Sequence, residues 1–205
     1  MLVIFDCDGV LVDSERLSCA ALRDALAELG VALTLGETMA EFLGRSRAHM
    51  LARSQELSGA PLPAGWAAGY DARRDAAFAR ELQAVPGVAD AVDAVEAAGH
   101  ATCVASSGDH RKMRLTLGMT GLYARFEGRI FSATEVGVGK PAPDLFEHAA
   151  ARSGFAPEHC VVVEDSHVGV AAARAAGMRV LGYGVEADVT FASMRQLPAL
   201  IVPAG

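Results

Sequence analysis

Short apolar segments constrain the fold of this chain more than any other feature of its sequence. Three of them are rich in β-forming residues and have the length of buried strands: Leu2–Phe5, Ala101–Ser107 and Cys160–Val163. Stretches with the apolar spacing of helices lie between them. This alternation predicts an α/β fold in which helices cover a parallel sheet. Residues that carry a hydroxyl or a carboxylate end the second segment and directly follow the first and the third.

The carboxyl ends of parallel strands meet at one edge of a sheet, so these polar residues are expected to lie close together. Asp6 and Asp8 follow the first segment, and Glu164 and Asp165 follow the third. Carboxylates at such close range repel one another unless a proton or a cation shares the site, and oxygen ligands of this kind hold Mg²⁺. Taken alone, the first pair is explained equally well as a turn built from Asp and Gly.

Two further segments add a hydroxyl and a cation. Ser106 ends the second strand just before a predicted helix, where backbone N–H groups collect anions. Lys140 lies in a stiff loop between Gly139 and Pro141, and the chain has only one other lysine, Lys112, beside sixteen arginines. A lysine in such a background indicates a need for a compact point charge. Taken alone, Ser106 and Lys140 are better explained as ordinary turn and loop residues.

The stretch from residue 15 to residue 85 has a different pattern. Helical spacing of apolar residues runs through it, and it contains no convincing strand. The alternation of helix and strand returns after it. The chain is therefore predicted to form an α/β core from residues 1–14 and 86–205, with an all-helical insertion at residues 15–85. Trp66 and Tyr70 lie at helical spacing and are assigned to the apolar core of this insertion.

The sequence resembles the haloacid dehalogenase superfamily, in its Mg²⁺-dependent phosphatase and phosphomutase branch. The resemblance rests on four motifs in that family's order and at its usual spacings. They are DCDGVLVDSE from Asp6, VASS from Val104, GKPAPD from Gly139 and VVVEDSHVG from Val161. The resemblance spans nearly the whole chain. It implies a Rossmann-like core of parallel strands, over which the inserted helices close as a cap.

The resemblance also implies roles for the polar residues. Asp6 corresponds to a nucleophile that forms an aspartyl-phosphate, and Asp8 corresponds to the general acid and base. Ser106, with Ser107 beside it, corresponds to the hydroxyl that binds a phosphate oxygen. Lys140 corresponds to the lysine that stabilises the nucleophile and the transferring phosphoryl group. The implied ligands of the Mg²⁺ ion are Asp6, Asp8 through its backbone carbonyl, Glu164 and Asp165.

These roles predict an enzyme that hydrolyses a small phosphorylated metabolite, with a sugar phosphate as the expected substrate. Arg45 and Arg47 lie in FLGRSR, which resembles the substrate-reading loop of the family's caps, and they are candidates to bind the substrate. They are explained equally well as solvated arginines. Two alternatives stay open: a β-phosphoglucomutase-type sugar phosphomutase and a catalytically idle binding protein.

Two differences from the mutases of the family favour hydrolysis. Those mutases carry a His near the start of the cap and a Lys within it. This chain has Ser18 at the corresponding early position and no lysine between residues 15 and 85. A mutase must protect its aspartyl-phosphate from water until a second hydroxyl arrives, and the loss of two orienting groups weakens that protection.

Composition and charge limit the partners that are expected. The formal net charge of −7 argues against nucleic acid, and no apolar run approaches the length of a membrane span. The four cysteines lack the spacing of metal ligands, and no disulfide is expected. A strand predicted almost at the first residue argues against a signal peptide. We therefore expect a cytoplasmic monomer whose partner is a small phosphorylated metabolite.

Overall fold

The computed structural model describes residues 1–201, and a six-stranded parallel sheet lies at its centre. The strands follow the order β3-β2-β1-β4-β5-β6, and every neighbouring pair is parallel. Their bounds are β1 Leu2–Phe5, β2 Ala101–Ser106, β3 Ile130–Ser132, β4 Cys160–Glu164, β5 Arg179–Tyr183 and β6 Val189–Phe191. The predicted α/β fold with a Rossmann-like sheet is confirmed. In this order the direction of winding reverses between β1 and β4, where ligands bind in open α/β sheets.

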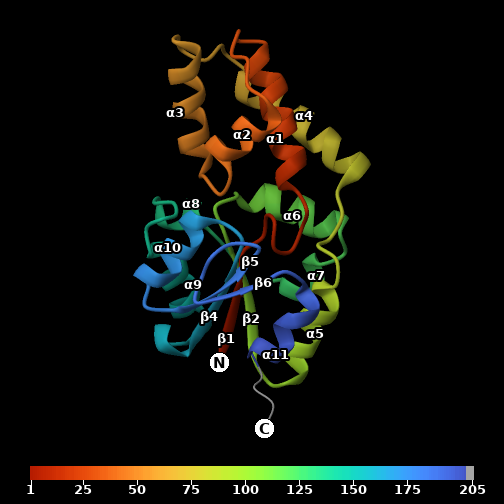
Figure 1. Cartoon of the computed structure of the whole chain (residues 1–205), viewed down its shortest axis with the longest axis vertical. Helices are drawn as coiled ribbons and strands as arrows, with labels where there is room; N and C mark the ends of the chain where they lie inside the picture. The colour runs from red at the N-terminus through yellow and green to blue at the C-terminus, as the bar shows by residue number, and fades with distance from the viewer. Residues whose placement is uncertain (202–205) are drawn as a thin grey trace.

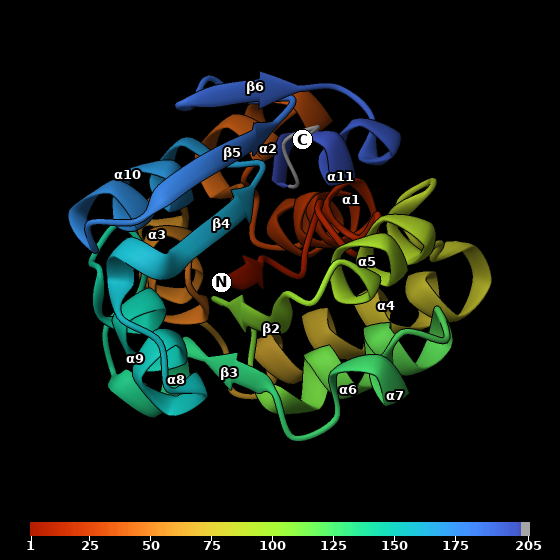
Figure 2. The ribbon, with the colours of Figure 1, turned by 90° about the horizontal axis from the view of Figure 1, so that it is seen from below.

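Helices cover both faces of the sheet, with α9 and α10 on one side and α5 and α11 on the other (Figure 2). Their bounds are α1 Glu15–Ala27, α2 Leu35–Phe42, α3 Arg47–Ser58, α4 Trp66–Glu81, α5 Val88–Ala97, α6 His110–Met119, α7 Tyr123–Phe126, α8 Ala133–Val136, α9 Asp144–Ser153, α10 His167–Ala175 and α11 Leu197–Ile201. Two 3₁₀ turns span Pro157–His159 and Met194–Gln196. Within residues 1–201, no helix has both the length and the hydropathy that crossing a membrane requires.

The central strand β1 is buried on both of its faces. Leu2 and Ile4 pack in the apolar cluster formed with α9 and α10, while Val3 and Phe5 pack in the cluster formed with α5, α7 and α11. All four side chains have no exposed surface. Burial on both faces explains why this strand is a continuous apolar run rather than an alternating one.

The helices α1–α4, called the helical segment below, lie together beyond the carboxyl ends of the strands (Figure 1). They pack around an apolar cluster of their own that contains Leu22, Leu26, Trp66 and Tyr70. The Trp66 and Tyr70 rings stack with centroids 6.4 Å apart, and Trp66 Nε1 donates a hydrogen bond to the Ala25 carbonyl at 3.0 Å. These two aromatic residues therefore lie in the core of the segment. The division of the chain into two domains after residues 14 and 85 stays a prediction.

The helical segment contacts the rest of the molecule at several points. The chain enters the helical segment just after Asp13 and leaves it just before Gln83. There the Asp13 N–H donates a hydrogen bond to the Gln83 carbonyl at 2.9 Å. An ion pair of 2.8 Å joins Arg111 of α6 to Asp75 of α4. Both contacts help to hold the helical segment over the end of the sheet.

The loop before α3 lies directly against the start of α10. Gly44 in this loop has a φ of +70°, and a Cβ atom placed on it would lie 2.9 Å from the Ser166 Cβ. Both the positive φ and the close approach require glycine at this position. The predicted substrate-reading loop is thereby brought to the carboxyl ends of the strands.

Candidate functional site

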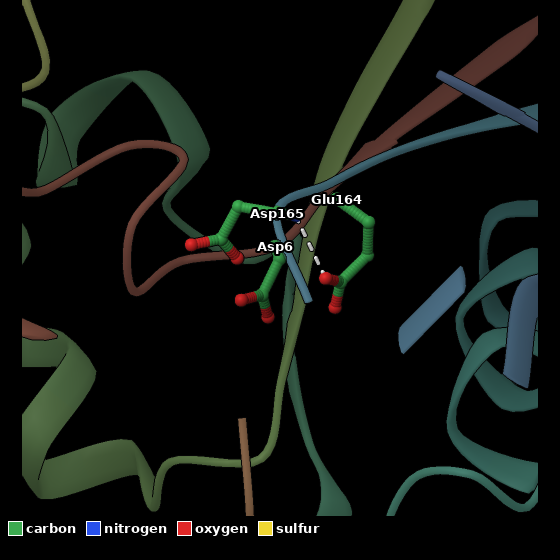
Figure 3. Close-up of side chains that lie close together, drawn as sticks. All are labelled: Asp6, Glu164 and Asp165. Carbon is green, nitrogen blue, oxygen red and sulfur yellow. Dashed lines mark hydrogen bonds between the residues drawn. The ribbon is translucent and has the colours of Figure 1, made fainter. Parts of the chain in front are cut away.

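The carboxylates of Asp6, Glu164 and Asp165, called the acidic cluster below, converge at the carboxyl ends of the neighbouring strands β1 and β4 (Figure 3). One oxygen from each of Asp6, Glu164 and Asp165 lies within 4.8 Å of the others. The Asp165 Oδ1 atom is buried and has no hydrogen-bond partner among the described residues. Gly9 leaves room for this side chain, since a Cβ on it would lie 1.9 Å from Asp165 Oδ2. The three residues fit a metal ion, and an all-oxygen set suits a hard cation such as Mg²⁺.

Burial and neighbouring charges raise the pKa of Asp6 and Asp165, and also that of the nearby Glu15. Burial raises the pKa of Asp6 to about 7, with Lys140 acting against this and Glu164 adding to it. Burial, with Glu15 and Glu164 nearby, also raises the pKa of Asp165 well above its usual range. Glu15, at the first position of α1, has its pKa raised to about 8, mainly by burial. Mutual repulsion of this kind is relieved when a cation binds among the carboxylates.

Lys140 connects Asp6 to Glu164. Its Nζ donates to Asp6 Oδ1 at 2.8 Å and also to Glu164 Oε1. Only 2% of its side chain is exposed. Burial alone would lower the pKa of Lys140, but the two carboxylates outweigh burial and hold the pKa above its usual value. The predicted nucleophile therefore has a permanent positive charge beside it.

Ser106 ends β2, and Ser107 follows it. Because β2 and β4 flank β1, the two serines lie on the opposite side of β1 from Glu164 and Asp165. Ser106 is 1% exposed, and its Oγ accepts a hydrogen bond from the Gly108 N–H at 3.1 Å. The Ser107 Oγ is buried and has no partner within the described part of the chain. Both residues line the same cavity as Asp6. Their hydroxyl groups are therefore placed to contact a bound anion.

Asp8 is held by two residues for which the sequence predicts no role. Ser14 Oγ donates to Asp8 Oδ1, and Lys112 Nζ lies 2.8 Å from the Asp8 carboxylate. Burial alone would raise the pKa of Asp8, but Lys112 outweighs it, and the pKa is lowered. Lys112 lies in the first turn of α6, where its backbone N–H donates to the capping Asp109 at 2.7 Å. The rarity of lysine was the one sequence signal for this residue.

A cavity lies between these groups and the helical segment. From the sheet end it is lined by residues that include Asp6, Asp8, Ser106, Ser107, Lys112 and Lys140. From the helical segment it is lined by residues that include Ser18, Phe42, Arg45, Arg47, Tyr70 and Arg74. The Ser18 Oγ is also buried without a partner among residues 1–201. All the predicted site residues thus meet in one region, with Glu164 and Asp165 beside Asp6.

Arg45 and Arg47 both line the cavity, but they differ in their partners. Arg47 makes two hydrogen bonds of 2.7 Å to the Asp71 carboxylate. Asp71 also accepts a bond of 2.9 Å from the buried Arg74, so this carboxylate is shared by two guanidinium groups. In the part of the chain that the structure describes, Arg45 forms no ion pair and is exposed. The two arginines therefore offer the cavity one fixed charge and one free charge.

Comparison with known proteins identifies the family of this chain. Residues 1–177 match the family model of haloacid dehalogenase-like hydrolases. The chain is 30% identical to 6-phosphogluconate phosphatase of Escherichia coli K12, over 97% of this chain and 93% of that protein. It is 29% identical to hexitol phosphatase B of the same strain, over 97% of this chain and 95% of that protein.

A solved structure is similar to this chain in both sequence and fold. It is a HAD family hydrolase from Deinococcus radiodurans R1 with bound phosphate and sodium, and it is 32% identical with a TM-score of 0.77. The match covers 98% of this chain and 94% of that one. This chain therefore belongs to the haloacid dehalogenase-like hydrolases and is an enzyme of their phosphatase group, as its motifs predict.

Proposed function

We propose that this enzyme hydrolyses a small phosphorylated sugar derivative in a Mg²⁺-dependent reaction, through an aspartyl-phosphate on Asp6. The observation that carries the proposal is the position of Asp6, which contacts Lys140, belongs to a cluster of carboxylates and lines a cavity. The relatives named above support the substrate class, since gluconate is a sugar acid and hexitols are sugar alcohols.

In the first half of the proposed reaction, an Asp6 oxygen attacks phosphorus and the alcohol oxygen leaves with a proton from Asp8. The nucleophile and the phosphoryl group are both anionic, and the Lys140 ammonium offsets their repulsion. Ser106 and Ser107 hold phosphoryl oxygens. A Mg²⁺ ion held by the acidic cluster and the Asp8 carbonyl would supply further positive charge to the transferring group.

In the second half, water attacks the aspartyl-phosphate, the bond between Asp6 and phosphorus breaks, and inorganic phosphate leaves. Asp8 accepts the proton of the attacking water. Its contact with Lys112 keeps Asp8 ionised, which suits this step. In the first half Asp8 carries a proton instead, so its contact with Lys112 has to loosen there. Splitting one displacement into two lowers the barrier that each must cross.

We propose that the helical segment acts as a cap over the cavity. Residues from α1, α3 and α4 line the cavity together with Asp6 and Asp8. Closure of such a cap excludes bulk water during phosphoryl transfer and places groups around the leaving alcohol. Arg45 and Arg47 are then the cap residues that contact the substrate.

Product analysis tests the proposed function. With Mg²⁺ and a panel of phosphorylated metabolites, we expect release of inorganic phosphate. With β-glucose 1-phosphate and a bisphosphate primer, free phosphate should exceed glucose 6-phosphate, because Ser18 and a helical segment without lysine lack the orienting groups of a mutase. Efficient isomerisation without phosphate release would identify a mutase instead. No turnover even of an aryl phosphate would leave a binding protein.

Arg47→Ala is expected to lower kcat/KM for the preferred sugar derivative about ten- to a hundredfold, the worth of one charge-assisted hydrogen bond. The loss on a small aryl phosphate should be much smaller, since that substrate offers the guanidinium no partner. Steady-state kinetics on both substrates measures the difference. Arg53→Ala is the matched control, because Arg53 lies on the same helix, pairs with Glu41 at 2.7 Å and does not line the cavity. Equal losses on both substrates would assign Arg47 to folding or closure.

A further inference from the structure

We infer that Lys112 binds a second anionic group of the substrate, so that the preferred substrate is a phosphate ester of a hydroxy acid. The inference rests on the proposed function and narrows its substrate class. Its basis is the place of Lys112 in the cavity. The side chain is 16% exposed, lines the cavity from α6 and contacts the residue that serves the leaving alcohol.

Lys112 lies on the leaving-group side of the reacting phosphorus. Its Nζ is 2.8 Å from the Asp8 carboxylate. Asp8 has to approach the ester oxygen to about 2.6–3.2 Å when it transfers a proton. The ammonium is therefore separated from the ester oxygen by the Asp8 carboxylate alone. Lys140, by contrast, contacts the nucleophile Asp6.

The other cationic side chains that line the cavity keep an acceptor throughout the reaction, either a carboxylate or water. Lys140 is shared by two carboxylates of the acidic cluster, and Arg47 and Arg74 are both held by Asp71. None of these carboxylates has to approach the leaving alcohol. Arg45 is exposed, so that water can solvate it.

Lys112 differs because its partner, Asp8, has to approach the leaving alcohol during the reaction. When Asp8 turns an oxygen toward the ester, the contact between Asp8 and Lys112 weakens, and a largely buried ammonium loses its acceptor. An unpaired charge in such a place is costly. A carboxylate on the leaving alcohol would restore the pairing, whereas a hydroxyl would replace it only in part. The cavity also holds the Ser18 hydroxyl, which has no partner within residues 1–201 and can bind a hydroxyl group of the same substrate.

Two matched pairs of substrates test this inference. Gluconate 6-phosphate and glucitol 6-phosphate differ only in a carboxylate against a hydroxymethyl group, and 2-phosphoglycolate and 2-hydroxyethyl phosphate repeat that difference on a short chain. In at least one pair, the wild-type enzyme should favour the acid about ten- to a hundredfold in kcat/KM. Lys112→Met should remove most of that preference, and thus lose far more on the acid than on its neutral partner. Arg114→Met removes a cation from the same helix outside the cavity and should keep the preference.

The outcomes separate the inference from the proposed function. Equal losses on acid and neutral substrates would show that Lys112 only positions Asp8, and wild-type enzyme without an acid preference in either pair would overturn the inference directly. If Lys112→Met does not fold, inhibition of the wild type by free products decides, since gluconate or glycolate should inhibit more strongly than glucitol or ethylene glycol. Failure to release phosphate from any substrate, an aryl phosphate included, would overturn the proposed function itself.

Discussion

Asp6→Asn is expected to abolish phosphate release and to leave the fold intact. The amide has almost the size of the carboxylate but cannot attack phosphorus as an anion, so kcat should fall by roughly 10⁴-fold or more. The fold should survive because the neighbouring carboxylates Asp8 and Glu164 repel Asp6. Lys140 also keeps its second partner, Glu164, after the substitution.

The matched control is Asp90→Asn, which removes an exposed carboxylate from the first turn of α5. Phosphate release and thermal unfolding should be measured on the wild type and on both variants. Asp90→Asn is expected to keep wild-type turnover, and all three proteins should unfold at similar temperatures. If Asp6→Asn kept more than about one per cent of the wild-type kcat, the nucleophile would have to be another residue.

Elements buried on both sides were the easiest to predict from the sequence. The predicted strand Leu2–Phe5 has the bounds of β1, because four consecutive buried apolar residues end abruptly at a carboxylate. The edge strands Ile130–Ser132 and Val189–Phe191 are only three residues long and partly exposed, so neither periodicity nor an apolar run distinguishes them from loops. Pairing with a neighbour in the sheet defines such strands, and that information is not local.

The same distinction applies to the site. Asp6, Ser106 and Glu164 were predictable as neighbours because each lies at the carboxyl end of a strand or directly after one, and parallel strands bring these ends together. The contact of Lys112 with Asp8 joins residues 104 positions apart. It depends on how α6 is rotated against the sheet, which no spacing along the chain specifies.

Activity is expected to require Mg²⁺ and to stop when a chelator is added, because the acidic cluster offers only oxygen ligands and its carboxylates repel one another. Mg²⁺ should also raise the temperature of thermal unfolding, since a ligand that binds the native state stabilises it. Full activity in excess chelator would contradict the metal site. A thermal shift without any Mg²⁺ requirement for turnover would restrict the ion to a structural role.

Asp165→Asn is the sharper test of where the ion binds. Glu164 accepts hydrogen bonds from Lys140 and from the Ser166 N–H and Oγ, so an amide there would disturb several contacts at once. The Asp165 Oδ1 has no such partner in residues 1–201, so the substitution Asp165→Asn should act mainly through the ion.

For Asp165→Asn we expect the Mg²⁺ concentration for half-maximal activity to rise on the order of ten- to a hundredfold, by analogy with the loss of groups that support a metal site. The Mg²⁺-dependent thermal shift should move to higher concentration in parallel, while Asp90→Asn leaves both curves unchanged. Because protein stability is measured without substrate, agreement of the two curves would assign the change to ion binding rather than to a later step of the reaction.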